Sequence, residues 1–218
     1  MSQALKIDFV SDISCPWCVI GLKALEQALE NQRETLTAEI HFQPFELNPQ
    51  MPPEGQDLNE HLVQKYGGTV EQFAGTRQAI RDRGEELGFA FRMDKRDRIY
   101  NTFDCHRLLH WAGEEGRQLE LKMALFRAYF TEGLNPGDHD VMLQAVRDVG
   151  LDESRAKAIL DGNDYHDEVR EQQKFYAGVG INAVPAVIIN DRYLIQGGQP
   201  VATFEQALLE IAAKAEEG

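Results

Sequence analysis

The sequence is poor in cysteine: its 218 residues include only three, Cys15, Cys18 and Cys105. Small secreted domains that rely on disulfides carry more cysteines, usually an even number, so a structural disulfide framework is excluded. Two of the three lie close together in the run Cys15-Pro16-Trp17-Cys18. In a reducing compartment, such a pair is typical of redox catalysis or of metal binding.

The sequence also lacks any apolar run of the roughly 18 residues that a membrane-spanning helix needs. Its first residues, MSQALKIDFV, show no basic segment followed by a long apolar one, and a strand pattern begins at about residue 4. We therefore expect no membrane association and a cytoplasmic protein.

Basic residues are scarce, since 22 Lys and Arg stand against 36 Asp and Glu, for a net charge of −14. Nucleic-acid binding relies on clustered Lys and Arg, so no nucleic-acid partner is expected. No long run of like charges forms a tail, and the acidic excess is read as a solubilising surface.

The first part of the chain predicts a strand, a helix and a second strand. Residues 4–10 alternate apolar and polar side chains, and residues 37–43 do so again before Pro44 ends them. Between them, apolar residues recur at helical spacing, which predicts a helix from about Pro16 to Asn31. A crossover of this length suits a parallel pair of strands.

The middle of the chain is dominated by the helical period. After an irregular, proline-rich connection at 46–56, Asp57 is expected to cap a helix through Tyr66, and Thr69 a helix through Leu87. Further helices are expected near 100–113, 117–131, 138–149, 152–160 and 164–178.

Strand patterns return at 186–189 and 192–195, joined by a turn at Asn190-Asp191, and 201–215 predict a last amphipathic helix. The order β-α-β, helical block, β-β-α is that of an α/β thioredoxin-like core with a large all-helical insertion. We assign 1–56 and 180–218 to the core and 57–179 to the insertion domain.

The Cys-Pro-Trp-Cys run lies where the first predicted helix begins, which places Cys15 at its N-cap and Pro16 at its first position. Unpaired backbone N–H groups and the helix dipole stabilise a thiolate there. Cys18 lies one turn further along. The pattern therefore predicts Cys15 as an exposed nucleophile and Cys18 as a partly buried resolving thiol.

A zinc half-site is the alternative for two cysteines at this spacing, but structural zinc takes four ligands. The rest of the chain has no second C-x-x-C. His106 and His110 share a helix face, yet no HExxH pattern accompanies them, so no metal is expected. Cys105 lies in an apolar helical stretch and is interpreted as a buried core residue.

Several blocks together resemble the DsbA family, and more closely its FrnE-like branch. They are DFVSDISCPWCVIG at 8–21, PFELNP at 44–49, NTFDCHRLLHWA at 101–112, LFRAYFTEG at 125–133, and GINAVPAVIIN with IQGGQP at 180–200. The resemblance implies dithiol–disulfide exchange with Cys15, Cys18 and Pro185 as its site. It also implies a cis Val184–Pro185 bond beside the sulfurs, where the chain alone would allow an ordinary trans proline at a strand start.

The resemblance has two departures. Periplasmic members carry His between the cysteines where this chain has Trp17, and they carry signal peptides. A strongly oxidising potential is therefore not expected, and reductase or isomerase activity is favoured over net oxidation of clients. The expected partners are protein or small-molecule thiols and disulfides. No cofactor is expected beyond glutathione as a redox partner.

Trp17 and Phe45 are candidate apolar contacts for a client, although Phe45 equally suits a core position. Gln196 is a candidate for the mouth of the site. Two other functions remain open. One is a glutathione-dependent isomerase or transferase, similar to the kappa-class transferases and the 2-hydroxychromene-2-carboxylate isomerases, which place Ser where Cys15 stands and lack a partner like Cys18. The other is a chaperone-like binder with incidental thiols.

Overall fold

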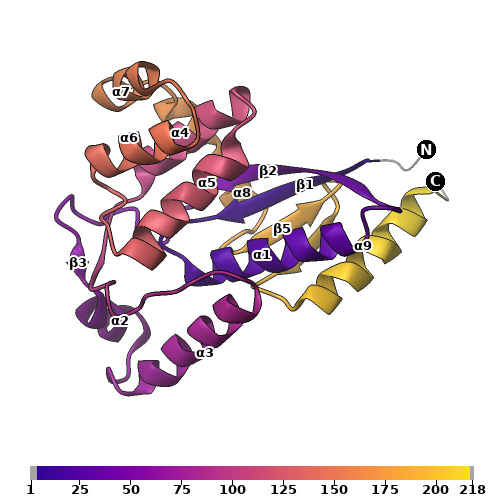
Figure 1. The fold of residues 1–218 in the computed structure, drawn as a ribbon, viewed down its shortest axis with the longest axis horizontal. Coiled ribbons are helices and arrows are strands. Elements are labelled where there is room, and N and C mark those ends of the chain that lie inside the picture. The colour runs from indigo at the N-terminus through magenta and orange to yellow at the C-terminus, as the bar shows by residue number, and fades with distance from the viewer. Residues whose placement is uncertain (1–3, 217–218) are drawn as a thin grey trace.

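A four-stranded sheet with helices on both faces forms the centre of the computed structural model, which describes residues 4–216 (Figure 1). Residues 1–3 and 217–218, which we assigned to the core, lie outside the described residues. The strands are β1 (Ala4–Ser11), β2 (Thr37–Pro44), β5 (Ala186–Ile189) and β6 (Tyr193–Gln196), in the order β2-β1-β5-β6. β1 and β2 are parallel, as predicted, whereas β5 is antiparallel to both β1 and β6.

The two faces of the sheet are covered by different helices because alternate side chains of β1 point in opposite directions. Leu5, Ile7 and Phe9 belong to the main core with α1 (Pro16–Asn31) and α9 (Val201–Glu216). Val10 instead joins a smaller cluster with Tyr176 of α8 (His166–Gly178). Figure 1 shows α1 and α9 on one side of the sheet and α8 on the other.

The segment between β2 and β5 is largely helical. Its remaining helices are α2 (Leu58–Tyr66), α3 (Gln72–Glu86), α4 (Phe103–Glu114), α5 (Gln118–Arg127), α6 (His139–Asp148) and α7 (Glu153–Asp161). Helices α4 to α7 pack on one another, while α2 and α3 lie apart from them (Figure 1). α3 packs against α1. No helix within residues 4–216 combines the length and the apolar character that crossing a membrane requires.

The α/β fold class, a thioredoxin-like core interrupted by a helical insertion, is confirmed, and the structure adds detail that periodicity missed. A two-residue antiparallel pair, β3 (Gln56–Asp57) with β4 (Arg98–Ile99), joins the predicted boundary between core and insertion to a later part of the insertion, and each strand is too short to show a period. Asp57 caps α2 as predicted, accepting a hydrogen bond from the Glu60 backbone N–H at 2.9 Å.

The prediction that Thr69 caps the next helix is wrong. α3 begins at Gln72, and its N-cap residue Glu71 makes no capping hydrogen bond through its side chain. The Gln72 side chain instead accepts a hydrogen bond from the Thr69 backbone N–H at 2.8 Å. The predicted helix over 117–131 also divides, since α5 ends at Arg127 and a π-helical turn continues over Ala128–Glu132.

The insertion is joined to the sheet at the edge strand β2. The Gln118 side chain accepts a hydrogen bond from the Phe42 N–H at 2.9 Å and donates one to the Phe42 carbonyl at 3.1 Å. The Gln118 amide thus satisfies the two backbone groups of Phe42 that a neighbouring strand would otherwise bond at this edge. Lys122 follows one turn later on the same helix, so this contact sets its place against the core.

Candidate functional site

The Cys-Pro-Trp-Cys run forms the first turn of α1, directly after β1 and a short loop. Cys15 is the N-cap residue, with φ −94° and ψ 110°, and Pro16 occupies the first turn. The Cys18 backbone N–H donates to the Cys15 carbonyl at 3.1 Å. The predicted placement of Cys15 at a helix N-terminus is therefore confirmed.

Both sulfurs are more buried than expected. Cys15 is 4% exposed and Cys18 is fully buried, and both are free thiols. The prediction of an exposed nucleophile is wrong, because the helical segment between β2 and β5 covers the end of α1. Cys15 opens instead into a cavity whose walls come from α1, α2 and α3. A reactant must enter that cavity to reach the sulfur.

The Val184–Pro185 segment lies beside Cys15, as predicted. The peptide bond is cis. The Cys15 thiol donates to the Val184 carbonyl at a sulfur–oxygen distance of 3.7 Å. Pro185 packs on α1 at Gly21, where a β-carbon would come within 3.0 Å of the proline ring. The fold thus brings together Cys15 and Val184, which are 169 residues apart.

The cavity next to Cys15 has a volume of about 380 Å³. Pro16, Trp17 and Val184, all predicted neighbours of the site, line it. The covering walls come from α2 and α3, with Leu62 and Phe73 among their apolar side chains. Apolar walls with a few polar groups are typical of sites for small molecules or extended segments.

Two predicted contacts lie elsewhere. Phe45 is partly buried and packs against the cluster of Val10 and Tyr176, so the core interpretation of this residue holds. Gln196 is exposed at the end of β6 and does not line the cavity. The sequence pattern alone does not show whether either side chain points into the cavity.

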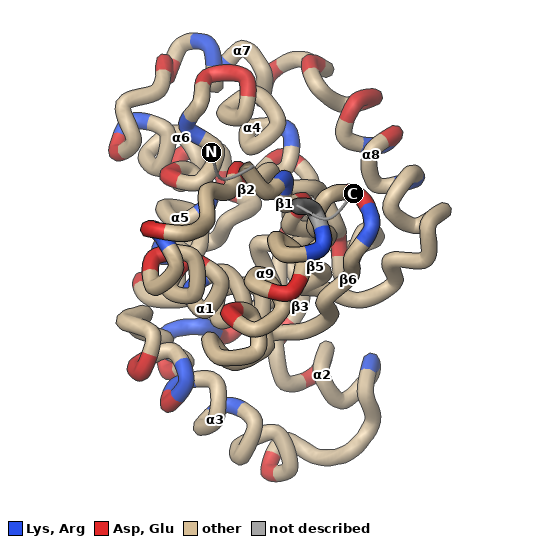
Figure 2. Tube along the Cα trace, turned by 90° about the vertical axis from the view of Figure 1, so that its right-hand side faces the viewer, with Lys and Arg blue, Asp and Glu red and all other residues tan. Residues whose placement is uncertain are grey.

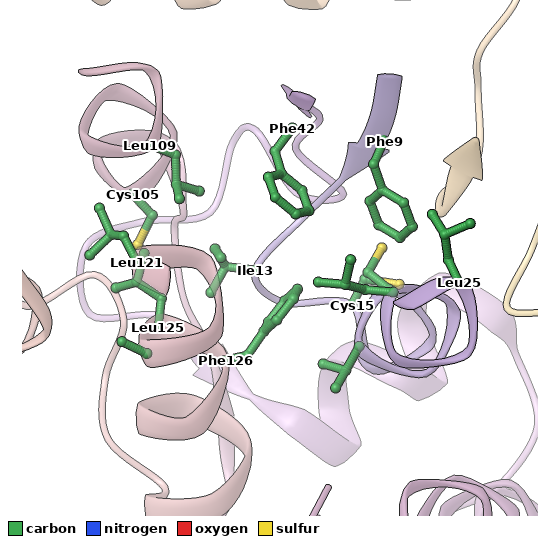
Figure 3. Packing of buried hydrophobic residues seen from close by; sticks show 14 of the residues in the cluster. Phe9, Ile13, Cys15, Leu25, Phe42, Cys105, Leu109, Leu121, Leu125 and Phe126 are labelled. Atoms are coloured by element: carbon green, nitrogen blue, oxygen red, sulfur yellow. The ribbon is translucent and has the colours of Figure 1, made fainter. Parts of the chain in front are cut away.

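Cys105 is a separate, buried residue. Its thiol donates to the Pro136 carbonyl at 3.0 Å. Burial raises its pKa, and the negative charge of Asp104 adds to the effect. Figure 3 shows Cys105 among Leu109, Leu121 and Leu125, on the far side of the core from Cys15. The predicted packed cysteine is confirmed, and its thiol is not part of the pair.

A carboxylate unforeseen from the sequence lies directly behind the pair. Asp12 is 1% exposed and accepts hydrogen bonds from the Ser14 hydroxyl at 2.8 Å, the Leu47 N–H at 2.7 Å and the Thr102 hydroxyl at 2.7 Å. The Nε2 atom of its neighbour His106 lies 3.7 Å from the carboxylate, beyond hydrogen-bond distance.

Burial alone would raise the pKa of Asp12, but the contacts to His106, Leu47 and Thr102 outweigh it and lower that pKa to about 2. The carboxylate is therefore ionised at neutral pH. A buried charge of this kind is retained only where hydrogen bonds and opposite charges compensate its desolvation.

Lys122 of α5 is a buried basic residue whose charge interacts with those of Asp12 and Cys18. Its ammonium group is fully buried and has no hydrogen-bond partner among residues 4–216. It lies 5.2 Å from the Phe126 ring centre and 5.7 Å from that of Phe42. Burial lowers the pKa of Lys122 to about 8, against the opposing effects of Cys18 and Asp12. The rings of Phe42 and Phe126 flank the space beside Cys15 in Figure 3.

Burial, a hydrogen bond to Cys15 and the Cys15 charge raise the pKa of Cys18 well above its usual value, while a hydrogen bond with the Asp12 backbone and the Lys122 charge act against this shift. Asp12 and Lys122 were missed from the sequence. The position of Asp12, three residues before Cys15, is the one feature of the sequence that could have indicated its role. Lys122 lies in an amphipathic helical stretch, and nothing in the sequence distinguishes it from a surface lysine.

The Asp12 network predicts a pH-dependent stability. Because the folded-state pKa of about 2 is below the ordinary value of 3.8, the unfolded chain takes up a proton first as pH falls. This contribution, about 2 kcal/mol, is present above pH 4 and is lost between about pH 4 and pH 2. Asp12→Asn should remove it and destabilise the protein by about the same amount at neutral pH.

Urea unfolding measured from pH 2 to pH 7 tests this. The wild-type and Asn-variant free energies should converge at the acidic end. Asp138→Asn, which changes an exposed helix cap on α6, is the matched control. Parallel pH curves for wild type and Asp12→Asn would contradict the assignment of a charged, buried carboxylate.

Comparisons with known proteins agree with this architecture. Residues 6–209 match the family described as DSBA-like thioredoxin domain. The uncharacterized protein YwbO of Bacillus subtilis (strain 168) is 30% identical over 207 residues, covering 94% of this chain and 96% of that protein. The crystal structure of the probable DsbA oxidoreductase SCO1869 from Streptomyces coelicolor is 32% identical, with a TM-score of 0.85, over 94% of this chain and 89% of that one.

A more distant structure, the cytosolic disulfide reductase DsbM from Pseudomonas aeruginosa with GSH, shares the fold. It has a TM-score of 0.64 at 17% identity, over 96% of this chain and 99% of that one. The family match over nearly all of the described residues and the 30% identity to a full-length relative lead to one conclusion: the chain belongs to the DSBA-like thioredoxin domain family.

Proposed function

We propose that the protein is a thiol–disulfide oxidoreductase or disulfide isomerase that works through Cys15 and Cys18. The observation that carries the proposal is the position of the Cys15 sulfur. It lies at the N-terminus of α1, beside Val184 and cis Pro185, and it opens into the cavity. Membership of the DSBA-like family supports the same chemistry.

In the first step, the Cys15 thiolate attacks one sulfur of a disulfide that has entered the cavity. The bond between the two substrate sulfurs breaks, and one of them leaves as a thiol with a proton from solvent. The N-terminal N–H groups of α1 stabilise the attacking thiolate. The Val184 carbonyl, which accepts from the Cys15 thiol in the reduced protein, becomes free when that thiol loses its proton.

In the second step, Cys18 loses its proton and displaces the remaining substrate sulfur from Cys15. Full burial makes a Cys18 thiolate unfavourable, and the Lys122 ammonium is the nearby charge that opposes this effect. We assign to Lys122 a positioning role: it favours the Cys18 thiolate and does not touch the substrate.

The direction of electron flow is also proposed. Trp17 stands between the cysteines in place of a histidine, so a mild dithiol is expected. A cytoplasmic poise of roughly −220 to −320 mV would keep such a dithiol reduced. We therefore propose a cytoplasmic reductase or isomerase of protein or small-molecule disulfides, with glutathione as a redox partner. The buried, adjacent Cys18 has no use in a glutathione transferase that relies on a single residue at position 15.

The assignment of the two thiols predicts different effects of single substitutions. Cys15→Ser should abolish disulfide reduction, measured as insulin reduction or as oxidation of the pre-reduced protein by a small disulfide. Cys105→Ser should retain nearly all activity, because its thiol lies elsewhere in the core. If both variants lost the same share of activity while keeping the same thermal stability, the assignment of Cys15 as the reactive thiol would be wrong.

Replacing Lys122 by Met should separate the two steps. Loss of the ammonium should slow the release by Cys18 about tenfold below pH 8, so that a mixed disulfide on Cys15 accumulates. The effect should shrink above pH 8, where the wild-type lysine loses its charge. Quenching with acid and measuring intact mass detects the mixed disulfide.

Stability distinguishes this role from a structural one. Because the folded-state pKa of Lys122, about 8, is below the ordinary 10.5, its burial destabilises the protein by on the order of 3 kcal/mol at neutral pH. Lys122→Met should therefore be at least as stable as wild type. A less stable variant without mixed disulfide would show that Lys122 serves packing alone.

A further inference from the structure

The cavity beside Cys15 is lined by positive charge, although the protein as a whole carries a net charge of −14. Lys65, Arg77 and Arg96 contribute to its walls, and no Asp or Glu is among its lining residues in the described part of the chain. Elsewhere acidic residues are widespread, and Figure 2 shows them along α3, α7 and α8.

Neutral groups, rather than carboxylates, hold the Lys65 side chain. Its ammonium donates to the Leu47 carbonyl and to the Asn48 side-chain oxygen, both at 2.8 Å. Within residues 4–216, no ion pair includes Lys65. Its charge is therefore not neutralised by the protein at the wall of the cavity.

The two arginines are held in the same way. Arg77 of α3 donates to the Asn59 side-chain oxygen at 2.9 Å and to the Val70 carbonyl at 3.1 Å. Arg96 donates to the Ser14 carbonyl at 3.3 Å, and its Nε is buried with no hydrogen-bond partner. Guanidinium groups without a carboxylate partner, at the wall of a partly enclosed site, suit an anionic ligand.

These charges act on the same space. Burial lowers the pKa of His61, and the positive charges of Lys65 and Arg96 lower it further. The pKa of Lys65 is itself lowered by burial and responds to the negative charges of Asp12 and Cys15. An anion in the cavity would thus meet the cations and the reactive sulfur together.

Size and lining restrict what can enter. A volume of about 380 Å³ suits a small molecule, and α2 and α3 cover the sulfur. Trp17, Leu62, Phe73 and Ile80 make much of the wall apolar. The site therefore combines apolar walls with unneutralised cations, which is complementary to a small molecule with an apolar body and a carboxylate.

We propose that the cavity selects small organic disulfides that carry a carboxylate, with the carboxylate held by Lys65 and the neighbouring Arg77 and the disulfide presented to Cys15. This inference rests on the proposed function and names the substrate class of that site; the class is defined by charge and size and is wider than glutathione.

The exchange balances without a further reactant in a single turnover. The protein dithiol gives up two electrons and two protons as the Cys15–Cys18 bond forms. The substrate bond between its two sulfurs breaks, and the two halves take up those electrons and protons and leave as two thiols. Repeated turnover needs a thiol reductant for the protein disulfide, either one dithiol or two molecules of a monothiol such as glutathione.

The test compares three disulfides of similar size and different charge. Pre-reduced protein is mixed with dithiodipropionate, bis(hydroxyethyl) disulfide or cystamine, which are anionic, neutral and cationic. Oxidation is followed by alkylating the remaining thiols and measuring intact mass. Each rate constant is divided by that of dithiothreitol with the same disulfide, which removes intrinsic differences in reactivity. The normalised rate should be about tenfold higher for the anion than for the neutral disulfide, and lowest for the cation.

Variants of Lys65 assign the preference to the cavity. Lys65→Gln keeps a side-chain donor for Leu47 and Asn48 but removes the charge, and it should reduce the anion-to-neutral ratio about fivefold. Lys65→Arg should restore the ratio. Lys157→Gln, which removes an exposed charge on α7, should leave it unchanged. The ratio is independent of any change in Cys15 reactivity, because the same thiolate attacks both disulfides.

A normalised anion-to-neutral ratio of about one, or a ratio unaffected by Lys65→Gln, would overturn this inference while leaving the proposed function intact. The inference would also be overturned if the protein reacted with a disulfide-containing peptide but with none of the three small disulfides. Failure of wild type to form a Cys15–Cys18 bond with any disulfide, peptide included, would instead overturn the proposed function.

Discussion

The Asp12 carboxylate fixes the end of α1 because hydrogen bonds converge on it from distant parts of the chain. Ser14 comes from the loop that carries Cys15, Leu47 from the connection after β2, and Thr102 from the start of α4. A single buried charge thus ties the sheet, the site and the helical insertion to one another. The position of the Cys15 sulfur and the walls of its cavity follow from that junction.

Near the same junction, the buried charge of Lys122 occupies a position where an apolar side chain would make the protein more stable. Lys122 is fully buried without a hydrogen-bond partner, and Cys18 is fully buried beside it. Burial opposes the ionised forms of both side chains, while their mutual attraction favours them together. The arrangement destabilises the folded protein, and in the proposed mechanism the Lys122 charge offsets part of the cost of forming the Cys18 thiolate.

The covering of Cys15 has a further consequence for selectivity. In an open site, any accessible disulfide could reach the thiolate. Here α2 and α3 leave a cavity with apolar walls and with cations such as Lys65, which pairs with no carboxylate in the described part of the chain. In the proposed substrate selection, size and charge control access to the sulfur, and α2 and α3 supply the walls that do so.

Much of the fold was predictable from the sequence, because β1, α1 and β2 have clear periods and the Cys-Pro-Trp-Cys run begins a helix with proline at its first turn. The cis Val184–Pro185 bond followed from the family resemblance and not from local pattern. The burial of Cys15 was not predictable, since it depends on how α2 and α3 pack over a site far from them in sequence.

The charged residues were missed for a related reason. Asp12 looked like a turn residue, and Lys122 like a surface lysine of an amphipathic helix. Local sequence gives no sign that their side chains enter the core, because tertiary contacts to Thr102 and Phe42 decide it. The positions of Phe45 and Gln196 likewise depend on which face of the sheet edge each side chain takes.

The pairing of Cys15 with Cys18 is tested most directly by a redox equilibrium read at single-residue level. The protein is equilibrated over a range of glutathione to glutathione disulfide ratios, trapped with acid, alkylated, digested without reduction and mapped by mass spectrometry. A two-electron transition that forms one intramolecular bond between Cys15 and Cys18, with Cys105 remaining a free thiol, is the expected result. A bond that includes Cys105, or the absence of any intramolecular disulfide at every ratio, would contradict the proposed site.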